Sequence, residues 1–486
     1  MVRISELCSL FSDGNKNIHK FKIKGLPILL DAAGGSVHLI DDAVWDILES
    51  IEKNRTSPAI ALEELEKKYP PKVIDEVMEE LVSLWEQGLL FADESFVEEF
   101  LNAEENGELT VKALCLHIAH DCNMTCGYCF ASQGSFGLER EIMSEEVGER
   151  TVDFLLENSG SRKNLEIDFF GGEPLINFKV VEHITAYGKK KAEEYGKTIN
   201  FTLTTNCLLL DEEVCEFVNE NGMQVILSLD GRKATNDRVR LLKNGGGSYD
   251  TVVERIMKFV ESRNHENYYV RGTFTRKNLD FSRDVFHLFD LGLKHVSVEP
   301  VVAPPEEYGF YGEDIPLLEE EYENLAEGLV KRMLAGQDID FYHFNIDLDD
   351  GQCLPRKIRG CGAGFEYFAV TPTGDIYPCH QFVGEKNFLM GNVFEGIKER
   401  YMMELFRSAH IFSKSRCREC WARFLCSGGC HASAYQFNGN LFEPFETACI
   451  LQKKRIECGI YFQLYKKFGH KISEIMNSRD SLGEKD

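Results

Sequence analysis

Three closely spaced cysteines constrain the fold and chemistry of this chain more than any other feature of its sequence. Cys122, Cys126 and Cys129 lie within the stretch from His120 to Phe130. A loop of that length can wrap three thiolates around one iron–sulfur cube, which would leave the fourth iron of a [4Fe–4S] cluster open. An open iron can chelate a small molecule and pass it an electron. The alternative is three unrelated buried thiols, because free cysteine is among the most buried residue types.

Length, charge and hydropathy narrow the class of protein. With 486 residues, the chain is longer than one typical domain. It carries 54 Lys and Arg against 80 Asp and Glu, a formal net charge of −26, which argues against nucleic acid as the main partner. No apolar run is long enough to span a membrane, and residues 1–6 lack the apolar segment of a signal peptide. We therefore expect a cytoplasmic protein without a membrane partner.

The distribution of the cysteines predicts metal binding. Disulfides are rare in the cytoplasm, where clustered cysteines more often hold a metal. Of the 16 cysteines, three lie in the motif above and eight lie between Cys353 and Cys449. The other five are scattered and expected to be structural; they are Cys8, Cys115, Cys207, Cys215 and Cys458.

The first hundred residues have the pattern of a small domain. Alternating or apolar segments bounded by turn residues predict three strands, and helical spacing of apolar residues predicts three helices after them. The strands are expected at 21–24, 28–31 and 37–40, and the helices at 44–51, 58–65 and 73–85. Ser57 and Pro58 read as the N-cap and first position of the second helix. An acidic stretch over 92–108 is expected to be a hinge.

From Val111 onward the pattern becomes strand, then helix, repeated. Six strands are predicted, at 113–118, 165–170, 200–206, 224–229, 269–275 and 295–299. Helices between successive strands imply a parallel sheet of the α/β class, here a partly closed barrel of six units. In such barrels the chemistry lies at the carboxyl ends of the strands.

Polar motifs follow the predicted strands at those ends. Gly171-Gly172-Glu173-Pro174 follows the second strand; its glycines would let the backbone approach a ligand, and Glu173 can bind an ammonium group. A simple tight turn would use the same residues. Glu299, at the end of the sixth strand, could face a ligand or bind a helix N-terminus.

The cysteines resume in the last third of the chain. Cys361 and Cys379 flank a predicted hairpin with its turn at 371–374. They are followed by Cys417, Cys420, Cys426, Cys430 and Cys449. Zinc is the rival to iron, because a Cys-x2-Cys pair is common in zinc ribbons, but the other spacings fit no simple four-cysteine ribbon. His380 directly follows Cys379 and could act as a base, although a lone histidine is often structural.

The first cysteine motif, with Tyr128 before its last cysteine, resembles the signature of the radical S-adenosylmethionine (SAM) superfamily. The Gly-Gly-Glu-Pro run resembles the second signature of that superfamily. The resemblance implies a [4Fe–4S] cluster on Cys122, Cys126 and Cys129, with SAM on its open iron. The SAM contacts that it implies are Tyr128, Gly171, Gly172, Glu173, Thr204, Asn206, Ser228, Asp230 and Arg240. Ser, Asn and Asp at such positions also simply cap turns.

The later cysteines resemble the SPASM extension of radical SAM enzymes, which carries two auxiliary [4Fe–4S] clusters. The resemblance implies three clusters in all. One auxiliary cluster would take Cys417, Cys420, Cys426 and Cys449, and the other would take Cys361, Cys379 and Cys430. Cys353 would be the fourth ligand of the latter cluster, or its fourth site would be open to substrate.

The N-terminal pattern resembles a winged-helix domain that recognises precursor peptides. Such domains bind a leader peptide as an added strand at a sheet edge. The alternative is a plain accessory or dimerisation domain. We therefore predict a recognition domain over 1–100, a radical SAM partial barrel over 111–340 and a SPASM domain over 341–486.

Together these features most resemble the maturases of six-cysteines-in-forty-five-residues (SCIFF) peptides. The resemblance implies an enzyme that forms thioether cross-links in a ribosomally made precursor peptide through a 5′-deoxyadenosyl radical. It implies an electron donor such as flavodoxin or ferredoxin. One alternative is the same chemistry on another target, such as a sulfatase active-site residue or another peptide cross-link. The other is a non-enzymatic, zinc-stabilised peptide-binding protein.

Overall fold

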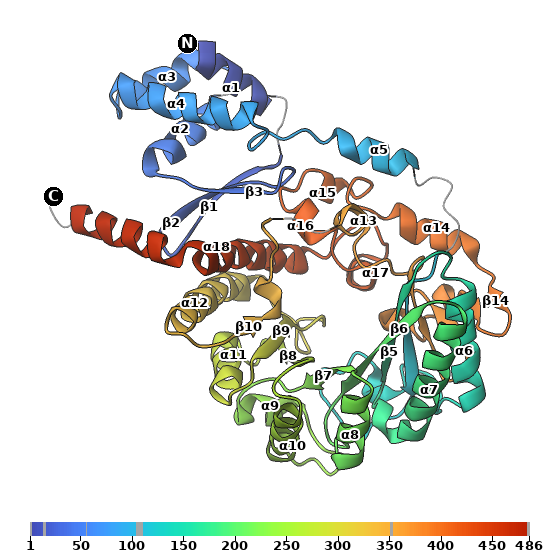
Figure 1. Ribbon diagram of the computed structural model, residues 1–486. Coiled ribbons are helices and arrows are strands. Elements are labelled where there is room, and N and C mark those ends of the chain that lie inside the picture. The colour runs from blue at the N-terminus through green and yellow to red at the C-terminus, as the bar shows by residue number, and fades with distance from the viewer. Residues whose placement is uncertain (1, 13–15, 55, 104–109, 350–352, 484–486) are drawn as a thin grey trace.

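A computed structural model describes residues 2–12, 16–54, 56–103, 110–349 and 353–483 of the chain (Figure 1). Three parts follow one another: a small unit of helices and strands, a large sheet with helices outside it, and a cysteine-rich segment that ends in a long helix, α18 (Glu446–Gly483). Among the described residues, none of the helices combines the length and apolar character needed to cross a membrane.

The N-terminal unit is built on a three-stranded antiparallel sheet. Its strands are β1 (Ile18–Ile23), β2 (Leu26–Asp31) and β3 (Ser36–Leu39), paired in that order, so β1 and β3 are its edges. The helices are α1 (Val2–Ser12), α2 (Asp42–Lys53), α3 (Pro58–Glu66), α4 (Pro71–Glu86) and α5 (Ser95–Ala103). The three predicted strands and three predicted helices are confirmed; α1 and α5 were not predicted.

One local prediction in this unit is confirmed and another is corrected. Ser57 is the N-cap of α3 and Pro58 its first residue, as expected, although the Ser57 side chain makes no capping hydrogen bond. The acidic stretch expected to be a hinge contains α5, because Phe96, Val97 and Phe100 give it an apolar face that packs beside the cysteine-rich segment. Residues 104–109 of that stretch lie outside the described part of the chain.

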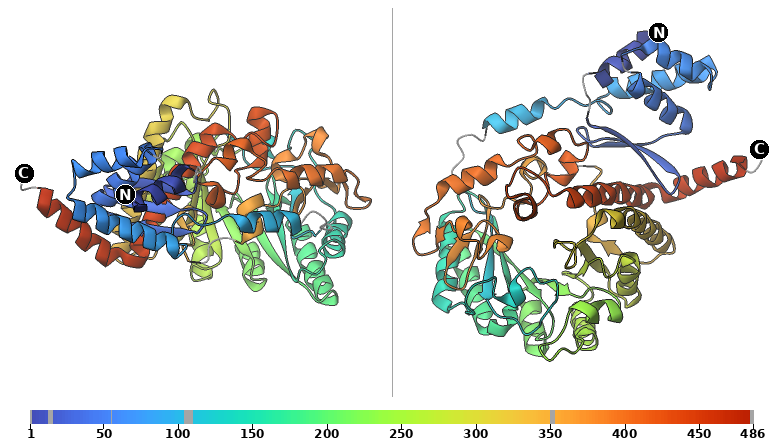
Figure 2. Two further views of the ribbon diagram at one scale, coloured as in Figure 1. Left: turned by 90° about the horizontal axis from the view of Figure 1, so that it is seen from above. Right: turned by 180° about the vertical axis from the view of Figure 1, so that it is seen from behind.

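The large sheet contains the six predicted parallel strands in chain order. They are β4 (Ala113–Ala119), β5 (Asn164–Gly171), β6 (Thr198–Thr205), β7 (Gln224–Ser228), β8 (Tyr268–Phe274) and β9 (His295–Pro300). The helices between and after them are α6 (Glu145–Glu157), α7 (Phe178–Glu194), α8 (Glu212–Glu220), α9 (Lys233–Val239), α10 (Tyr249–Ser262), α11 (Phe281–Asp290) and α12 (Ile315–Leu334). These helices lie outside the arc that the strands follow (Figure 2).

The sheet extends beyond these six strands at both ends. The short strand β10 (Asp340–Phe341) pairs parallel with β9. At the other end, β11 (Tyr367–Val370) pairs parallel with β4, and β12 (Asp375–Tyr377), β13 (Gly391–Asn392) and β14 (Gly396–Ile397) follow as antiparallel strands. The predicted hairpin of β11 and β12 is confirmed. The cysteine-rich segment therefore continues the same open eleven-stranded sheet. The partial-barrel form of the sheet, the winged-helix character of the N-terminal unit and the domain boundaries stay predictions.

The cysteine-rich segment also carries short helices and contacts the N-terminal unit. The helices are α13 (Leu354–Arg359), α14 (Arg400–Ser408), α15 (Ser415–Arg418), α16 (Arg423–Cys426) and α17 (His431–Asn438). The His19 ring stacks on Trp421 with 3.7 Å between ring centroids, and its Nε2 lies 2.9 Å from Glu457 Oε1 on α18. Helix α18 packs along α12 and touches β1, so it joins all three parts (Figure 1).

Candidate active site

The three cysteines of the first motif lie together in the loop that follows β4. All three are partly buried. Burial raises the pKa of Cys122 to about 11, and the negative charges of Cys126 and Cys129 act in the same direction. Three thiolates this close repel one another unless a cation neutralises them, and a coordinated metal keeps a thiol deprotonated. The loop is therefore suited to an iron–sulfur cluster.

Backbone contacts hold this cysteine loop against the segment that follows α9. Thr125 N donates to Leu241 O and Gly127 N to Val239 O, each over 2.8 Å. A Cβ atom at Gly127 would collide with the Tyr308 hydroxyl, so a larger residue there would require the Tyr308 side chain to move. Residues far apart in sequence thus fix the shape of the loop.

The two glycines after β5 pack against the cysteine loop. Gly171 has a φ of +125°, and a Cβ at Gly172 would collide with the carbonyl oxygen of Asp121. Gly172 N donates to Ala119 O over 2.8 Å. The glycines therefore let the end of β5 approach the backbone of the loop, and their expected contact with a ligand stays a prediction.

Glu173 is fully buried beside this loop and lines the cavity described below. It accepts hydrogen bonds from Thr205 Oγ1 over 2.8 Å, from Asn206 N over 2.7 Å and from Leu175 N over 3.1 Å. Burial raises its pKa to about 7 although these bonds oppose the rise. Because a carboxylate has about four acceptor positions, Glu173 retains capacity for about one further donor.

Tyr128, Asp230 and Arg240 form one hydrogen-bonded group. The Tyr128 hydroxyl donates to both carboxylate oxygens of Asp230 over 2.9 and 2.8 Å, and Arg240 Nη1 donates to the hydroxyl over 3.0 Å. Thr273 N also donates to Asp230 over 3.1 Å. Asp230 is not among the residues that line the cavity, and its hydrogen bonds hold Tyr128, which does line it. Its direct contact with SAM stays a prediction.

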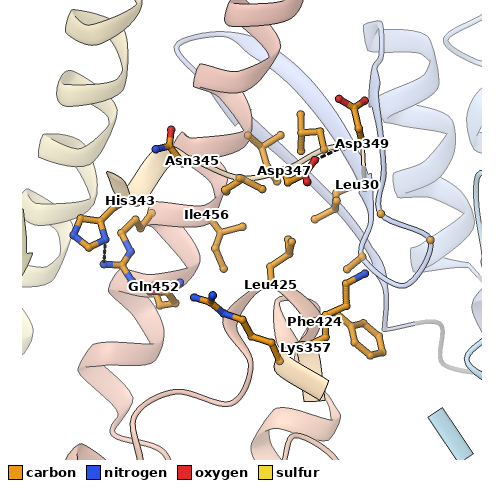
Figure 3. A pocket seen from close by; sticks show the side chains of 18 of the residues that line it. Leu30, His343, Asn345, Asp347, Asp349, Lys357, Phe424, Leu425, Gln452 and Ile456 are labelled. Atoms are coloured by element: carbon orange, nitrogen blue, oxygen red, sulfur yellow. Dashed lines mark hydrogen bonds between the residues drawn. The ribbon is translucent and has the colours of Figure 1, made fainter. Parts of the chain in front are cut away.

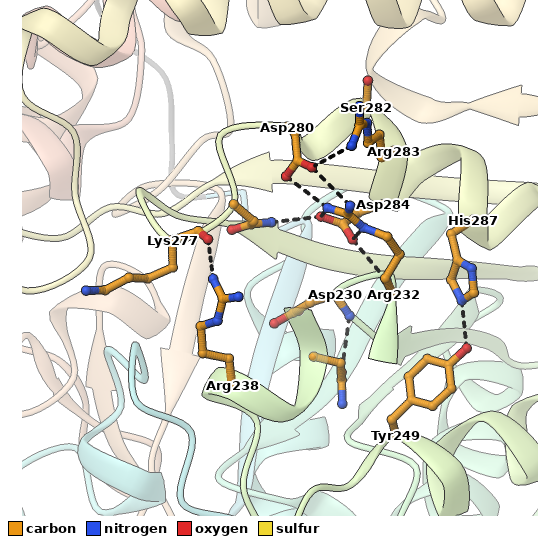
Figure 4. A network of polar contacts seen from close by, with 12 residues as sticks. Asp230, Arg232, Arg238, Tyr249, Lys277, Asp280, Ser282, Arg283, Asp284 and His287 are labelled. Atoms are coloured by element: carbon orange, nitrogen blue, oxygen red, sulfur yellow. Dashed lines mark hydrogen bonds and ion pairs between the residues drawn. The ribbon is translucent and has the colours of Figure 1, made fainter. Parts of the chain in front are cut away.

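The loop that carries Asp230 is anchored by an ion-pair network (Figure 4). Arg232 donates from Nε to Asp284 over 2.7 Å and from Nη2 to Asp280 over 2.9 Å. Asp284 is fully buried and also accepts from Asn278 over 3.1 Å. These contacts fix the carboxyl end of β7, and through Asp230 they fix Tyr128.

Arg240 has unused hydrogen-bonding capacity. It is 8 % exposed and lines the cavity, and within the described part of the chain its buried Nε has no hydrogen-bond partner. A buried guanidinium nitrogen without a partner is costly. Its position therefore fits a carboxylate supplied by a ligand.

A cavity of about 460 Å³ connects these groups at the carboxyl ends of the strands. Its volume is in the range of small-molecule sites. The residues predicted to hold the first cluster or to contact SAM all line this cavity, except Asp230. They are Cys122, Cys126, Tyr128, Cys129, Gly171, Gly172, Glu173, Thr204, Asn206, Ser228 and Arg240. Asn206 Nδ2 donates to Asn123 Oδ1 over 2.6 Å, a partner that was not predicted.

The same cavity is also lined by ionisable groups, of which sequence reasoning missed Asp168 and Arg271 but singled out Glu299. Asp168 shares the inner face of β5 with Phe170, and burial raises its pKa to about 6. Arg271 on β8 pairs with Glu299 on β9. Burial opposes the charge of Glu299, but Arg271, His343 and Arg455 together outweigh it and its pKa falls to about 2. Asp168 could have been found from the sequence, because polar residues alternate with apolar residues along β5.

His380 lines this cavity from the cysteine-rich side. Its Nδ1 lies 3.2 Å from the Tyr367 hydroxyl, and its ring centroid lies 5.1 Å from that of Phe170 and 5.8 Å from that of Phe130. Burial lowers its pKa to about 4, and Arg271 adds to this. The imidazole is therefore neutral at pH 7. Its predicted role as a base stays a prediction.

The later cysteines fall into two sets. Burial raises the pKa of Cys379, and the charges of Cys430 and Cys361 raise it further. In the second set, burial raises the pKa of Cys417 to about 12, and that of Cys449 to about 11. The members of the second set are Cys417, Cys420, Cys426 and Cys449, and together they line a small cavity of about 60 Å³. This grouping agrees with the ligand sets that the resemblance implies, and that each set holds a cluster stays a prediction.

Cys353 is the remaining candidate ligand among the later cysteines. It is exposed and precedes α13, and the structure assigns it to neither set. Across the described residues, no three or more His, Cys, Asp or Glu side chains are arranged to hold a single metal ion. The ligands of a [4Fe–4S] cube each bind a different iron, so they do not converge on one point.

A second cavity, of about 370 Å³, lies between the N-terminal unit, residues 342–349 and α18 (Figure 3). Leu30, Leu425 and Ile456 give it an apolar part, and Lys357 a charged one. In its wall, His343 Nδ1 accepts from Arg455 over 3.1 Å, and His343 Nε2 lies 3.8 Å from Glu299, which lines the first cavity.

Comparison with known families identifies the two cysteine-bearing parts. Residues 116–275 match the family described as the radical SAM superfamily, and residues 361–421 match the SPASM iron–sulfur cluster-binding domain. The chain combines a radical SAM domain with a SPASM domain. These domains imply [4Fe–4S] clusters and SAM as cofactors, and the grouped cysteines and the unpaired Arg240 nitrogen fit them.

Two known proteins are similar to this chain over most of their own length. The radical SAM cyclopropyl synthase TigE of Paramaledivibacter caminithermalis is 22% identical over 459 residues, which cover 87% of this chain and 90% of TigE. The cysteine-type anaerobic sulfatase-maturating enzyme of Clostridium perfringens (strain 13 / Type A) is 27% identical over 334 residues, 64% of this chain and 85% of that enzyme.

Two solved structures share the fold. The structure of anSMEcpe with bound AdoMet and the Cp18Cys peptide has a TM-score of 0.60 at 20% identity and covers 74% of this chain and 100% of that one. The structure of Streptococcus suis SuiB bound to precursor peptide SuiA has a TM-score of 0.51 at 16% identity and covers 89% of this chain and 98% of that one. The radical SAM fold is thus common to all three.

Proposed function

We propose that this radical SAM enzyme matures a ribosomally made, cysteine-rich precursor peptide by forming thioether cross-links. One observation carries the proposal. The same cavity is lined by the three-cysteine loop on one side and by His380, the residue after Cys379, on the other. A peptide in that cavity would lie between a SAM site and an auxiliary cluster ligand.

The proposed cofactors are three [4Fe–4S] clusters and SAM. Cys122, Cys126 and Cys129 would hold the first cluster, and the two later sets of cysteines would hold the auxiliary clusters. When bound, the clusters supply one electron to cleave SAM to methionine and a 5′-deoxyadenosyl radical, and accept one electron back. The electron donor, flavodoxin or ferredoxin, and the cytoplasmic location remain part of the proposal.

The residues around the cavity suit the polar groups of SAM. Glu173 has capacity for one more donor and would accept the ammonium group. Arg240 has an unpaired buried nitrogen and would bind the carboxylate. Thr204, Asn206 and Ser228 would contact the ribose. Asp230 would act through Tyr128 by fixing its position.

The overall reaction balances without any further reactant. One carbon–hydrogen bond and one sulfur–hydrogen bond of the peptide break, and one carbon–sulfur bond forms. The carbon's hydrogen leaves in 5′-deoxyadenosine, and the thiol's hydrogen leaves as a proton. Excluding water and other hydrogen donors from the radical is the task of the cavity wall.

The N-terminal unit would recognise the leader of the precursor. Its edge strand β3 borders a groove of about 580 Å³ between α4 and α18. Leu39, Leu84 and Phe468 are among the apolar residues that line the groove. An extended leader could pair with β3 through its backbone and place apolar side chains in the groove. The fold similarity to SuiB, whose structure holds a precursor peptide, supports this proposal.

Oxidation of a sulfatase active-site residue is a second candidate function. The similarity to the sulfatase-maturating enzyme of Clostridium perfringens favours it. That similarity covers 64% of this chain. The edge strand and groove of the N-terminal unit favour a peptide with a leader instead.

The deciding experiment is an anaerobic reaction of the reconstituted enzyme with SAM, reductant and a cysteine-rich peptide encoded beside its gene. Thioether formation would remove two hydrogens per cross-link and protect the cysteine from alkylation, both measured by mass spectrometry. Loss of sulfur from a peptide based on a sulfatase motif, with the cysteine-rich peptide unchanged, would establish the second candidate function instead.

A further inference from the structure

Lys414 is a buried lysine in the SPASM domain that the proposed reaction does not use. It precedes α15 and is 1 % exposed. Its Nζ donates to Gly428 O over 2.8 Å. Within the described residues no carboxylate pairs with it. A buried ammonium without an anionic partner is costly, so we expect a source of negative charge near Lys414.

The two sets of auxiliary cysteines provide that charge. Burial lowers the pKa of Lys414, whereas Cys417 and Cys426 of one set, and Cys430 and Cys361 of the other, raise it. The geometry places Lys414 beside both sets, because its carbonyl oxygen accepts from Cys417 N over 3.0 Å and its Nζ donates to Gly428 O between Cys426 and Cys430. A [4Fe–4S] cluster with thiolate ligands carries net negative charge, which would compensate the lysine better than thiols do.

The hydrogen bond of Lys414 reaches the segment that joins the two sets. Gly428 lies at the middle of residues 426–430, and this short run begins with Cys426 and ends with Cys430. Each of these cysteines belongs to a different set. The lysine thus ties down the backbone between the two sets and places one positive charge there.

We propose that Lys414 is a positioning residue that raises the reduction potentials of both auxiliary clusters. Reduction adds negative charge to a cluster, so a fixed cation beside it favours the reduced state. The effect is large where the surroundings are dry, because charges interact more strongly at low dielectric constant. The inference rests on the auxiliary clusters of the proposed function, and not on the identity of the peptide product.

The test is potentiometric titration of reconstituted full-length protein, followed by electron paramagnetic resonance. Cys122, Cys126 and Cys129 are replaced by Ala in every sample, so that only the auxiliary clusters contribute. Lys414→Met removes the charge and the hydrogen bond, Lys414→Gln removes the charge but retains a donor, and Lys414→Arg retains both. Lys197→Met is the matched control, because Lys197 also donates to a backbone carbonyl, Gly160 O, over 2.6 Å.

We expect Lys414→Met and Lys414→Gln to shift the reduction potentials of the auxiliary clusters to more negative values. Lys414→Arg and Lys197→Met should leave these potentials unchanged. Unchanged potentials in both neutral variants would overturn the inference. A shift of the potentials in Lys414→Met but not in Lys414→Gln would also overturn it, since that result would assign the effect to the hydrogen bond. If the Met variant does not bind iron, the comparison of Gln with Arg decides. Iron analysis of the starting protein tests the auxiliary clusters separately.

Discussion

At the scale of single residues, the cavity is built from side chains whose hydrogen bonds are already partly used. Glu173 accepts three internal hydrogen bonds, and Tyr128 is fixed between Asp230 and Arg240. Such preorganisation lowers the entropic cost of binding a polar ligand. It also separates residues that contact a ligand from residues that position others. Sequence could identify the residue types at the strand ends, but not the hydrogen bonds among them, such as the one from Tyr128 to Asp230.

Glu173→Gln should weaken SAM binding while the clusters still assemble. The change removes the negative charge proposed to bind the ammonium group, and a hydrogen bond to a charged group contributes about 1.5–3 kcal/mol. The dissociation constant of SAM should therefore rise by roughly 10- to 100-fold. Titration of the reconstituted protein with SAM gives the constant, and iron analysis is the control. An unchanged constant would exclude this role for Glu173.

His343 should make the protein less stable in mild acid. Burial and the nearby Arg455 lower its pKa to about 3, so the folded chain keeps it neutral. The unfolded chain takes up a proton below about pH 6.5, and this stability is therefore lost as the pH falls from there toward 3. Protonation of Nδ1 would also break the hydrogen bond from Arg455.

The measurement compares unfolding of wild type and His343→Gln in denaturant at pH 7.5 and 5.5. Between these two pH values, the free energy of unfolding of wild type should fall by about 1 kcal/mol more than that of the variant. Other titrating groups contribute equally to both proteins and cancel. An equal loss in both would show that His343 is not held neutral by the fold.

At the scale of elements, regular local patterns were predictable and long-range pairings were not. The six parallel strands follow from short apolar runs separated by helical periods, and the β11–β12 hairpin from its turn residues. The parallel pairing of β11 with β4 joins residues about 250 positions apart and has no local signal. Likewise, the contact between Asn206 and Asn123 depends on how two loops meet.

Replacing Cys122, Cys126 and Cys129 together by Ala should remove one cluster without disturbing the others. The loop that carries them is separate from both later sets of cysteines, which lie in another part of the chain. Anaerobic reconstitution should give about twelve irons per chain for wild type and about eight for the variant. The variant should form no 5′-deoxyadenosine from SAM. Zinc in place of iron, or continued 5′-deoxyadenosine formation, would contradict this assignment.

At the scale of the whole molecule, one helix joins the parts that the proposed reaction needs. Helix α18 packs on α12, which follows the six parallel strands, and it also contacts β1 and forms one wall of the groove beside β3. The second cavity lies along the same helix, and His343 in its wall lies 3.8 Å from Glu299, which lines the active-site cavity (Figure 3). A leader bound in the groove would tether the rest of the precursor to the enzyme, which raises the effective concentration of the segment to be modified.

Leu39→Glu should weaken binding of the full-length precursor and leave SAM cleavage intact. Leu39 is an exposed apolar residue at the end of β3 that lines the groove, and burying a carboxylate beneath the leader is unfavourable. The loss of one buried apolar side chain alone costs about 1.5–3 kcal/mol, so the affinity should fall at least about 10-fold. Ile60→Glu is the matched control, because Ile60 is 50 % exposed on α3 and does not line the groove. Equal affinity of both variants and wild type for labelled precursor would mean that this unit is an accessory domain, and the peptide-maturase proposal would lose its structural support at the N-terminus.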